Sequence, residues 1–165
     1  MARKVFYSFH YKADAFRVAK IRNIGAIEGN LACRDNDWEA IVGRGKAAIE
    51  RWIDDQMRGT SCTIVMIGRE TAGRPWINYE IEKTWENRKG LLGIHIHNLL
   101  DHSQFRTSKG ANPFDRFTLN NGKEPLSKVV KTYDPPHSDS GQVYEYIRNN
   151  IQGWVETAIE IRSSR

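Results

Sequence analysis

The chain has 165 residues, of which 39% are hydrophobic and 27% are charged, and its formal net charge is +5. Its five Trp, six Tyr and six Phe exclude a disordered chain, and no apolar run reaches the roughly 18 residues of a membrane-spanning helix. We therefore expect one soluble domain over residues 1–165, with a hydrophobic core of its own.

The first residues lead almost directly into strand-like sequence, without the hydrophobic region and cleavage site of a signal peptide. We therefore expect a cytoplasmic protein that does not contact a membrane. In that compartment Cys33 and Cys62 are expected to be buried thiols rather than a disulfide. The basic residues are scattered along the chain, so we expect a solvated surface and no nucleic-acid partner.

The chain opens with a short apolar run at residues 4–9, which predicts a buried strand. Residues 10–14 then predict a loop. Helical spacing follows over residues 15–24, and Asp14 is a plausible N-cap for this helix because its side-chain oxygen can accept from an early backbone N–H.

Three strand-like and two helix-like segments follow in alternation. Residues 31–33 indicate a weak strand, and residues 46–57 predict a helix. Its apolar positions recur at the spacing of one helix face: Ile49, Trp52, Ile53 and Met57. Residues 63–67 are the most apolar strand candidate. A helix that starts at Pro75 and runs to about residue 87 comes next, followed by a strand over residues 91–99.

The composition changes over residues 101–140, where Gly, Pro, Asn, Ser and Lys dominate. The pairs Asn112-Pro113, Asn121-Gly122 and Pro135-Pro136 indicate turns. We expect a loop-rich insertion here, with a final strand over residues 129–133. Apolar residues at helical spacing predict that a helix over residues 143–161 closes the chain.

Short apolar strands that alternate with helices indicate parallel pairing. The sequence therefore predicts an α/β three-layer sandwich, with a central, mostly parallel sheet of about five strands flanked by helices. Ligands on such sheets bind outside the carboxyl ends of the strands. The predicted loops at that edge are residues 10–14, 34–38 and 68–76, and the segment from residue 98 onward.

The helix after the most apolar strand carries the candidate for chemistry. At about 100° per residue, Ile77 and Ile81 share its apolar face, and Glu82 points to the opposite side. Glu80 lies at the border of that face, one turn after Trp76. It is either a flanking surface charge or a carboxylate that meets a ligand at the edge of the sheet.

Other constellations are weaker. Residues 43–48 formally fit a glycine-rich dinucleotide fingerprint, but no clean strand precedes them, and Ala47 stands where a Walker A loop needs Ser or Thr. His95 and His97 would face the same side of a strand. No Cys cluster or third spaced ligand accompanies them, so we expect no metal site. No nucleophile elbow for a Ser–His–Asp triad is present.

Residues 5–11, Val-Phe-Tyr-Ser-Phe-His-Tyr, resemble the first sequence box of TIR domains. Residues 62–68, followed by Trp76 and by Glu80 four positions later, resemble the strand–loop–Trp-x-x-x-Glu segment of NAD-cleaving TIR domains. Together these segments are similar to the TIR-like group of the bacterial Thoeris antiphage system. The similarity covers about residues 3–101, and the segment over residues 101–140 is longer than a plain TIR domain needs.

This resemblance implies a TIR/flavodoxin-like fold and cleavage of the nicotinamide–ribose bond of NAD, with Glu80 as the catalytic carboxylate. NAD is then the substrate, and no cofactor is implied. The residues expected to contact it share one edge of the predicted sheet: Ser8, Phe9, His10, Tyr11, Asp35 and Trp76.

The resemblance also implies an ADP-ribose-derived nucleotide, linear or cyclic, that signals to a separate effector protein in antiphage defence. A phage-derived activator and self-assembly into a homo-oligomer are further implied partners. The alternative is a catalytically silent TIR-like or flavodoxin-like module that acts through protein–protein contacts.

Overall fold

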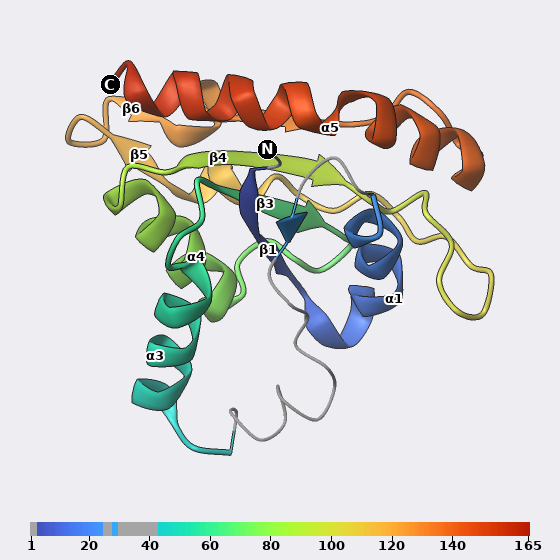
Figure 1. The fold of residues 1–165 in the computed structure, drawn as a ribbon, viewed down its shortest axis with the longest axis horizontal. Helices are drawn as coiled ribbons and strands as arrows, with labels where there is room; N and C mark the ends of the chain where they lie inside the picture. The colour runs from blue at the N-terminus through green and yellow to red at the C-terminus, as the bar shows by residue number, and fades with distance from the viewer. Residues whose placement is uncertain (1–2, 25–27, 30–42) are drawn as a thin grey trace.

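The computed structural model describes residues 3–24, 28–29 and 43–165, and it is organised around one parallel sheet (Figure 1). The strand order is β2-β1-β3-β4-β7. The strands are β1 (Lys4–Phe9), β2 (Glu28–Gly29), β3 (Cys62–Ile67), β4 (Gly90–His95) and β7 (Lys131–Tyr133). Four of them have three residues or more, and β2 contributes only two. The predicted α/β architecture with a mostly parallel central sheet is confirmed.

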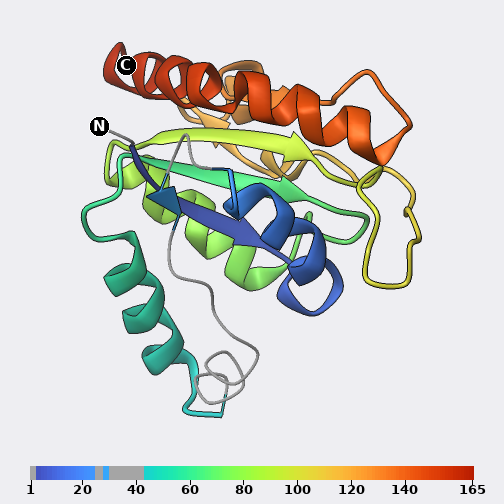
Figure 2. The same cartoon turned by 45° about the vertical axis from the view of Figure 1, so that its right-hand side comes forward.

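Both faces of the central strands are covered, which explains their continuous apolar sequence. All six residues of β3 and all six of β4 are buried. The helices are α1 (Tyr11–Arg22), α3 (Lys46–Met57), α4 (Pro75–Glu86) and α5 (Ser140–Ser163). Figure 2 shows α5 along one side of the sheet and α3 and α4 on the other.

The side chains divide the core in the same way. On one face, Val18 of α1 and Ile147 of α5 join a cluster with Tyr7 and Ile64. On the other face, Ile77 and Ile81 of α4 pack with Val65 and Ile67. A third cluster packs Ile49, Ile53 and Met57 of α3 against Phe6. The three-layer prediction therefore holds, and α4 is fixed against β3 by its apolar face.

The start of α1 differs from the prediction. The helix begins at Tyr11, so most of the predicted loop over residues 10–14 is its first turn, and His10 occupies the N-cap position. The Asp14 N–H donates to the His10 carbonyl within this turn. Asp14 is therefore not the N-cap. It is buried and paired with Arg17, whose Nη1 lies 3.1 Å from the carboxylate.

The segment over residues 101–140 contributes to the core as well as to loops. It contains a short 3₁₀ helix (Pro113–Arg116), a two-stranded antiparallel ribbon of β5 (Thr118–Leu119) and β6 (Glu124–Pro125), a second 3₁₀ turn (Leu126–Lys128) and then β7. Phe114, Leu126 and Val130 join the cluster under α4. The predicted final strand is present, but it is limited to the three residues of β7.

Other predicted elements lie close to their expected positions, including α3, β3, α4 and α5. The buried thiol of Cys62 is free, as predicted. The predicted strand over residues 31–33, Cys33 and the loop over residues 34–38 lie outside the described residues. No helix in the described part of the chain combines the length and apolar character that a membrane span requires.

Candidate active site

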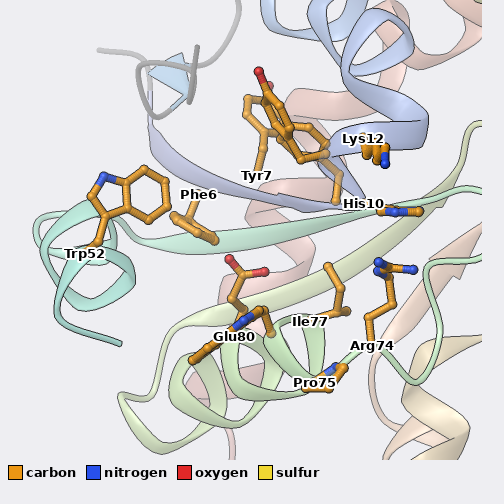
Figure 3. A pocket seen from close by; sticks show the side chains of 12 residues that line it. Phe6, Tyr7, His10, Lys12, Trp52, Arg74, Pro75, Ile77 and Glu80 are labelled. Atoms are coloured by element: carbon orange, nitrogen blue, oxygen red, sulfur yellow. The ribbon is translucent and has the colours of Figure 1, made fainter. Parts of the chain in front are cut away.

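A cavity of about 240 Å³ opens where β1 ends and α4 begins (Figure 3). Its walls come from four elements: the end of β1 with the first turn of α1, the N-terminal half of α4, and one position of α3. The lining residues are Phe6, Tyr7, Phe9, His10, Tyr11, Lys12, Trp52, Arg74, Pro75, Trp76, Ile77 and Glu80. The position agrees with the expectation that a ligand binds at the carboxyl edge of the parallel sheet.

Glu80 is the carboxylate of this cavity. It is 8% exposed, because α4 presses its apolar face, including Ile77 and Ile81, onto the sheet. The Ser8 hydroxyl, on β1, donates a 2.7 Å hydrogen bond to Oε1 of Glu80. In Figure 3 the carboxyl points toward Phe6. Glu80 is therefore a buried group on the wall of a cavity, and its interpretation as a surface charge is wrong.

Burial raises the pKa of Glu80 to about 8, and the hydrogen bond from Ser8 opposes that rise. Burial dominates because a carboxylate loses its hydration in a water-poor environment, whereas one hydroxyl restores only part of it. At neutral pH the carboxyl is therefore mostly protonated. Perturbation of this kind on a cavity wall is typical of groups that carry out chemistry.

The opposite end of the cavity is positively charged. Arg74 and Lys12 line it, both are exposed, and Figure 3 shows Arg74 directed toward His10. Burial and the neighbouring Arg74 lower the pKa of His10, so the imidazole is predominantly neutral near neutral pH. The cavity thus has a carboxyl end and a cationic end.

Aromatic side chains from α3 and α4 pack beside the same cluster of apolar residues near Glu80. Trp76 packs edge-on against Tyr79, with ring centroids 5.8 Å apart, and both contact the α3 cluster. The Tyr79 hydroxyl donates a 2.9 Å hydrogen bond to Asp54 of α3. This bond links α4 to α3, and side chains of both helices, Trp52 and Glu80, line the cavity.

The structure brings most of the predicted site residues together. Phe9, His10, Tyr11, Trp76 and Glu80 all line the cavity. Ser8 is fully buried behind the carboxyl of Glu80 and is not a lining residue. Asp35 lies outside the described residues.

The sequence interpretation missed Trp52, Lys12 and Arg74. Helical spacing predicts Trp52 on the apolar face of α3, and the structure confirms this. Trp52 also lines the cavity, which the spacing does not reveal. Arg74 stands two positions before Trp76, at the N-cap of α4. Its place immediately before the predicted helix start was the available signal.

His95 and His97 face the same side, as their spacing in a strand predicts, with ring centroids 5.9 Å apart. Burial lowers the pKa of His95 to about 4, so this ring is neutral. Among the residues that the structure describes, no group of three or more His, Cys, Asp or Glu side chains could hold a metal ion.

The family model of the Thoeris protein ThsB, TIR-like domain, matches residues 6–101 of this chain. The chain belongs to this family. The matched segment runs from β1 past β4 and contains all twelve residues that line the cavity.

A curated relative within the same family is a protein of Bacillus cereus (strain MSX-D12) that carries the name "Putative cyclic ADP-D-ribose synthase ThsB1". It is 38% identical to this chain over 120 residues, which cover 70% of this chain and 62% of the relative. The matched region thus spans less than two thirds of the length of this ThsB relative.

Proposed function

We propose that this ThsB-family domain cleaves the nicotinamide–ribose bond of NAD and converts the ADP-ribose part into a linear or cyclic nucleotide signal. The observation that carries the proposal is the buried carboxyl of Glu80 on the wall of a cavity lined by aromatic and cationic side chains. The name of the Bacillus cereus relative supports the same class of reaction.

One carboxylate is sufficient for this chemistry. When the glycosidic bond breaks, its electron pair moves to the pyridinium nitrogen, and nicotinamide leaves as a neutral ring without protonation by a general acid. The positive charge passes to the ribose, which becomes oxocarbenium-like, as in glycoside hydrolysis. An ionised Glu80 beside the ribose stabilises that charge in a water-poor site.

The acceptor determines the product. Addition of water to C1′ gives ADP-ribose and releases one proton. Addition of a nucleophilic atom from the adenine end of the same molecule gives a cyclic product. We propose that the lining rings of Trp52, Trp76, Phe9 and Tyr11 stack on the bases and exclude water.

The raised pKa of Glu80 fits a cationic substrate. In the empty cavity burial favours the neutral acid, with a pKa of about 8. A positively charged nicotinamide ring beside it favours the carboxylate, because an opposite charge at short range lowers the pKa of an acid. Binding of NAD would thus ionise the group that the reaction needs.

The remaining roles are part of the same proposal. Ser8 holds the Glu80 carboxyl in place, and His10 and Asp35 contribute polar contacts to the nucleotide. The product acts on a separate effector protein in bacterial antiphage defence in the cytoplasm. A phage-derived component triggers the reaction, and the domain assembles with copies of itself. NAD is a substrate, and no resident cofactor or metal takes part.

The test is nicotinamide release from NAD by the purified protein, measured by chromatography with and without extract from phage-infected cells. Glu80→Gln keeps the size of the side chain and removes the charge, so the rate should fall at least about 100-fold. Glu82→Gln is the matched control, because Glu82 is exposed on the other side of α4. Its rate should equal that of the wild type.

Equal rates for wild type and Glu80→Gln would overturn the assignment of Glu80. Absence of nicotinamide release from the wild-type protein under both conditions would instead favour the catalytically silent interaction module.

A further inference from the structure

We infer that Arg74, Lys12 and the N-terminus of α4 form a diphosphate-binding subsite at the cationic end of the cavity, so that the domain selects dinucleotides over nucleosides. This inference rests on the proposed function, because it assigns the part of NAD that this end of the cavity receives. The cleavage chemistry proposed for Glu80 does not itself require this contact with the diphosphate.

The cationic end of the cavity carries two side chains, Arg74 and Lys12, that have no charged partner among the described residues. Arg74 and Lys12 both line the cavity, and within residues 3–24, 28–29 and 43–165 neither takes part in an ion pair or a side-chain hydrogen bond. Arg17, by contrast, has four hydrogen-bond partners. The guanidinium of Arg74 is thus available for an anion, and its fork-shaped donors match two phosphate oxygens.

A second feature is the start of α4. Arg74 is the N-cap residue, and no side chain caps the first turn. Pro75 has no N–H to offer, and the N–H of Asn78 already donates to the Arg74 carbonyl. The N–H groups of Trp76 and Ile77 are therefore left at a helix end that favours negative charge. Backbone donors and the Arg74 side chain point to the same class of ligand.

His10 lies beside the Arg74 guanidinium at the cationic end of the cavity (Figure 3). Its Nδ1 is buried and has no hydrogen-bond partner among the described residues. Burial is the main cause of the lowered pKa of His10, nearby Arg74 and Lys12 lower this pKa further, and Glu70 raises it. Glu70 is exposed and does not line the cavity, so the two cations outnumber the carboxylates at this end. A neutral imidazole nitrogen at this position suits a phosphate or ribose oxygen.

The spacing along α4 connects the two ends. Arg74 precedes Glu80 by six residues, which corresponds to about 9 Å of helix rise. In NAD a ribose separates the diphosphate from the bond that breaks. A diphosphate held at Arg74 would therefore place the nicotinamide ribose on the Glu80 side of Arg74 and the adenosine on the other side. A nucleoside without phosphate could not be oriented in this way.

The experiment uses full-length Glu80→Gln protein, which does not consume the ligand, and measures binding by isothermal titration calorimetry. The ligands are NAD, inorganic pyrophosphate and nicotinamide riboside. Adding Arg74→Gln should weaken the binding of NAD and of pyrophosphate about ten-fold and leave the riboside unchanged. Lys12→Gln should have the same pattern with a smaller effect, because an exposed ammonium binds as a single point charge. Arg148→Gln is the control, since Arg148 is exposed on α5 and does not line the cavity.

Unchanged affinity for NAD and pyrophosphate in both Arg74→Gln and Lys12→Gln would overturn the subsite, and nicotinamide release by the wild type would still uphold the proposed function. An equal loss for all three ligands would also overturn it, because Arg74 would then shape the cavity rather than bind phosphate. Pyrophosphate binding that depends on Arg74, without any binding of NAD, would uphold the subsite and contradict the proposed function.

Discussion

The hydroxyl of Ser8 and the carboxyl of Glu80 are joined by a 2.7 Å hydrogen bond, although 72 positions separate them in the chain. Ser8 lies on β1 and Glu80 on α4, so the bond links the sheet to the helix that covers it. The hydroxyl favours the ionised carboxylate and burial favours the neutral acid, and burial is the larger effect.

Ser8→Ala is predicted to raise the pKa of Glu80 further. The variant removes a donor to a charged acceptor, a contact that is worth about 1.5–3 kcal/mol, and burial remains. The midpoint of the Glu80 carboxyl resonance, followed by carbon-13 NMR, should move upward from about 8. Thr63→Val is the control, because it removes a buried hydroxyl that bonds to Thr84 rather than to the carboxyl. A midpoint that does not move in Ser8→Ala would show that burial alone sets this pKa.

The stability of the protein should fall as the pH rises through 8. The pKa of Glu80 is about 8 in the folded protein and near 4.5 when unfolded, so the folded state binds the extra proton between these values. The stabilisation that the raised pKa of Glu80 contributes is complete below about pH 4.5 and is lost as the pH passes 8. Between pH 6.5 and pH 8.5 the free energy of unfolding of the wild type should fall by about 2 kcal/mol more than that of Glu80→Gln, because this variant has no titratable group at position 80. Urea unfolding of both proteins at both pH values measures this difference. An equal change in the free energy of unfolding of the two proteins would contradict the prediction.

Gly68→Ala is predicted to destabilise the fold, whereas Gly153→Ala should not. A Cβ at Gly68 would overlap Oδ2 of Asp14, and the Asp14 carboxylate is fixed by Arg17. Overpacking of this kind costs about 1–3 kcal/mol. Gly153 is exposed on α5 with open space around it, and Ala there should stabilise the helix by roughly 0.5–1 kcal/mol. Thermal unfolding of the two variants compares them directly, and a neutral Gly68→Ala would mean that Asp14 can move away.

Arg17→Ala should be among the most destabilising single substitutions in α1. Arg17 is 2% exposed, pairs with Asp14, and donates to the carbonyls of Leu99 and Phe105 in the loop after β4. Its removal leaves a buried carboxylate unpaired, which costs about 3–5 kcal/mol. Arg148→Ala removes an exposed pair with Glu145 and should cost less than about 1 kcal/mol. Chemical denaturation distinguishes the two, and equal losses would contradict the structural role of Arg17.

The sequence predicted the α/β architecture and the edge of the sheet that carries the site. It did so because buried strands and amphipathic helices leave periodic apolar patterns, and because parallel strands bring their carboxyl ends to one edge. The pattern around Glu80 could not separate a surface charge from a buried acid. That distinction depends on how closely α4 packs on β3 and on the hydroxyl that Ser8 offers from β1.

The misplaced start of α1 has a similar cause. Asp14 fits the local pattern of an N-cap, but its carboxylate pairs with Arg17. This pair is buried under the loop after β4. Trp52 likewise serves both the core cluster of α3 and the cavity. The Asp14–Arg17 pair is local, but the loop after β4 that Arg17 contacts and the cavity that Trp52 borders come from distant parts of the chain, and contacts of that kind leave no local signal.

The buried acid also determines how the site exchanges protons with the solvent. At pH 7 the empty protein holds a proton on Glu80 that a bound nicotinamide cation would expel. Calorimetric heats for the binding of an NAD analogue that keeps the nicotinamide cation but cannot be cleaved should therefore depend on the ionisation enthalpy of the buffer, and that dependence should vanish in Glu80→Gln. Identical heats in phosphate and Tris buffer for the wild type would rule out the release of a proton. With that release, NAD binding at this cavity should become weaker in more acidic solution, so at a fixed NAD concentration a fall in pH should lower the fraction of sites that are occupied.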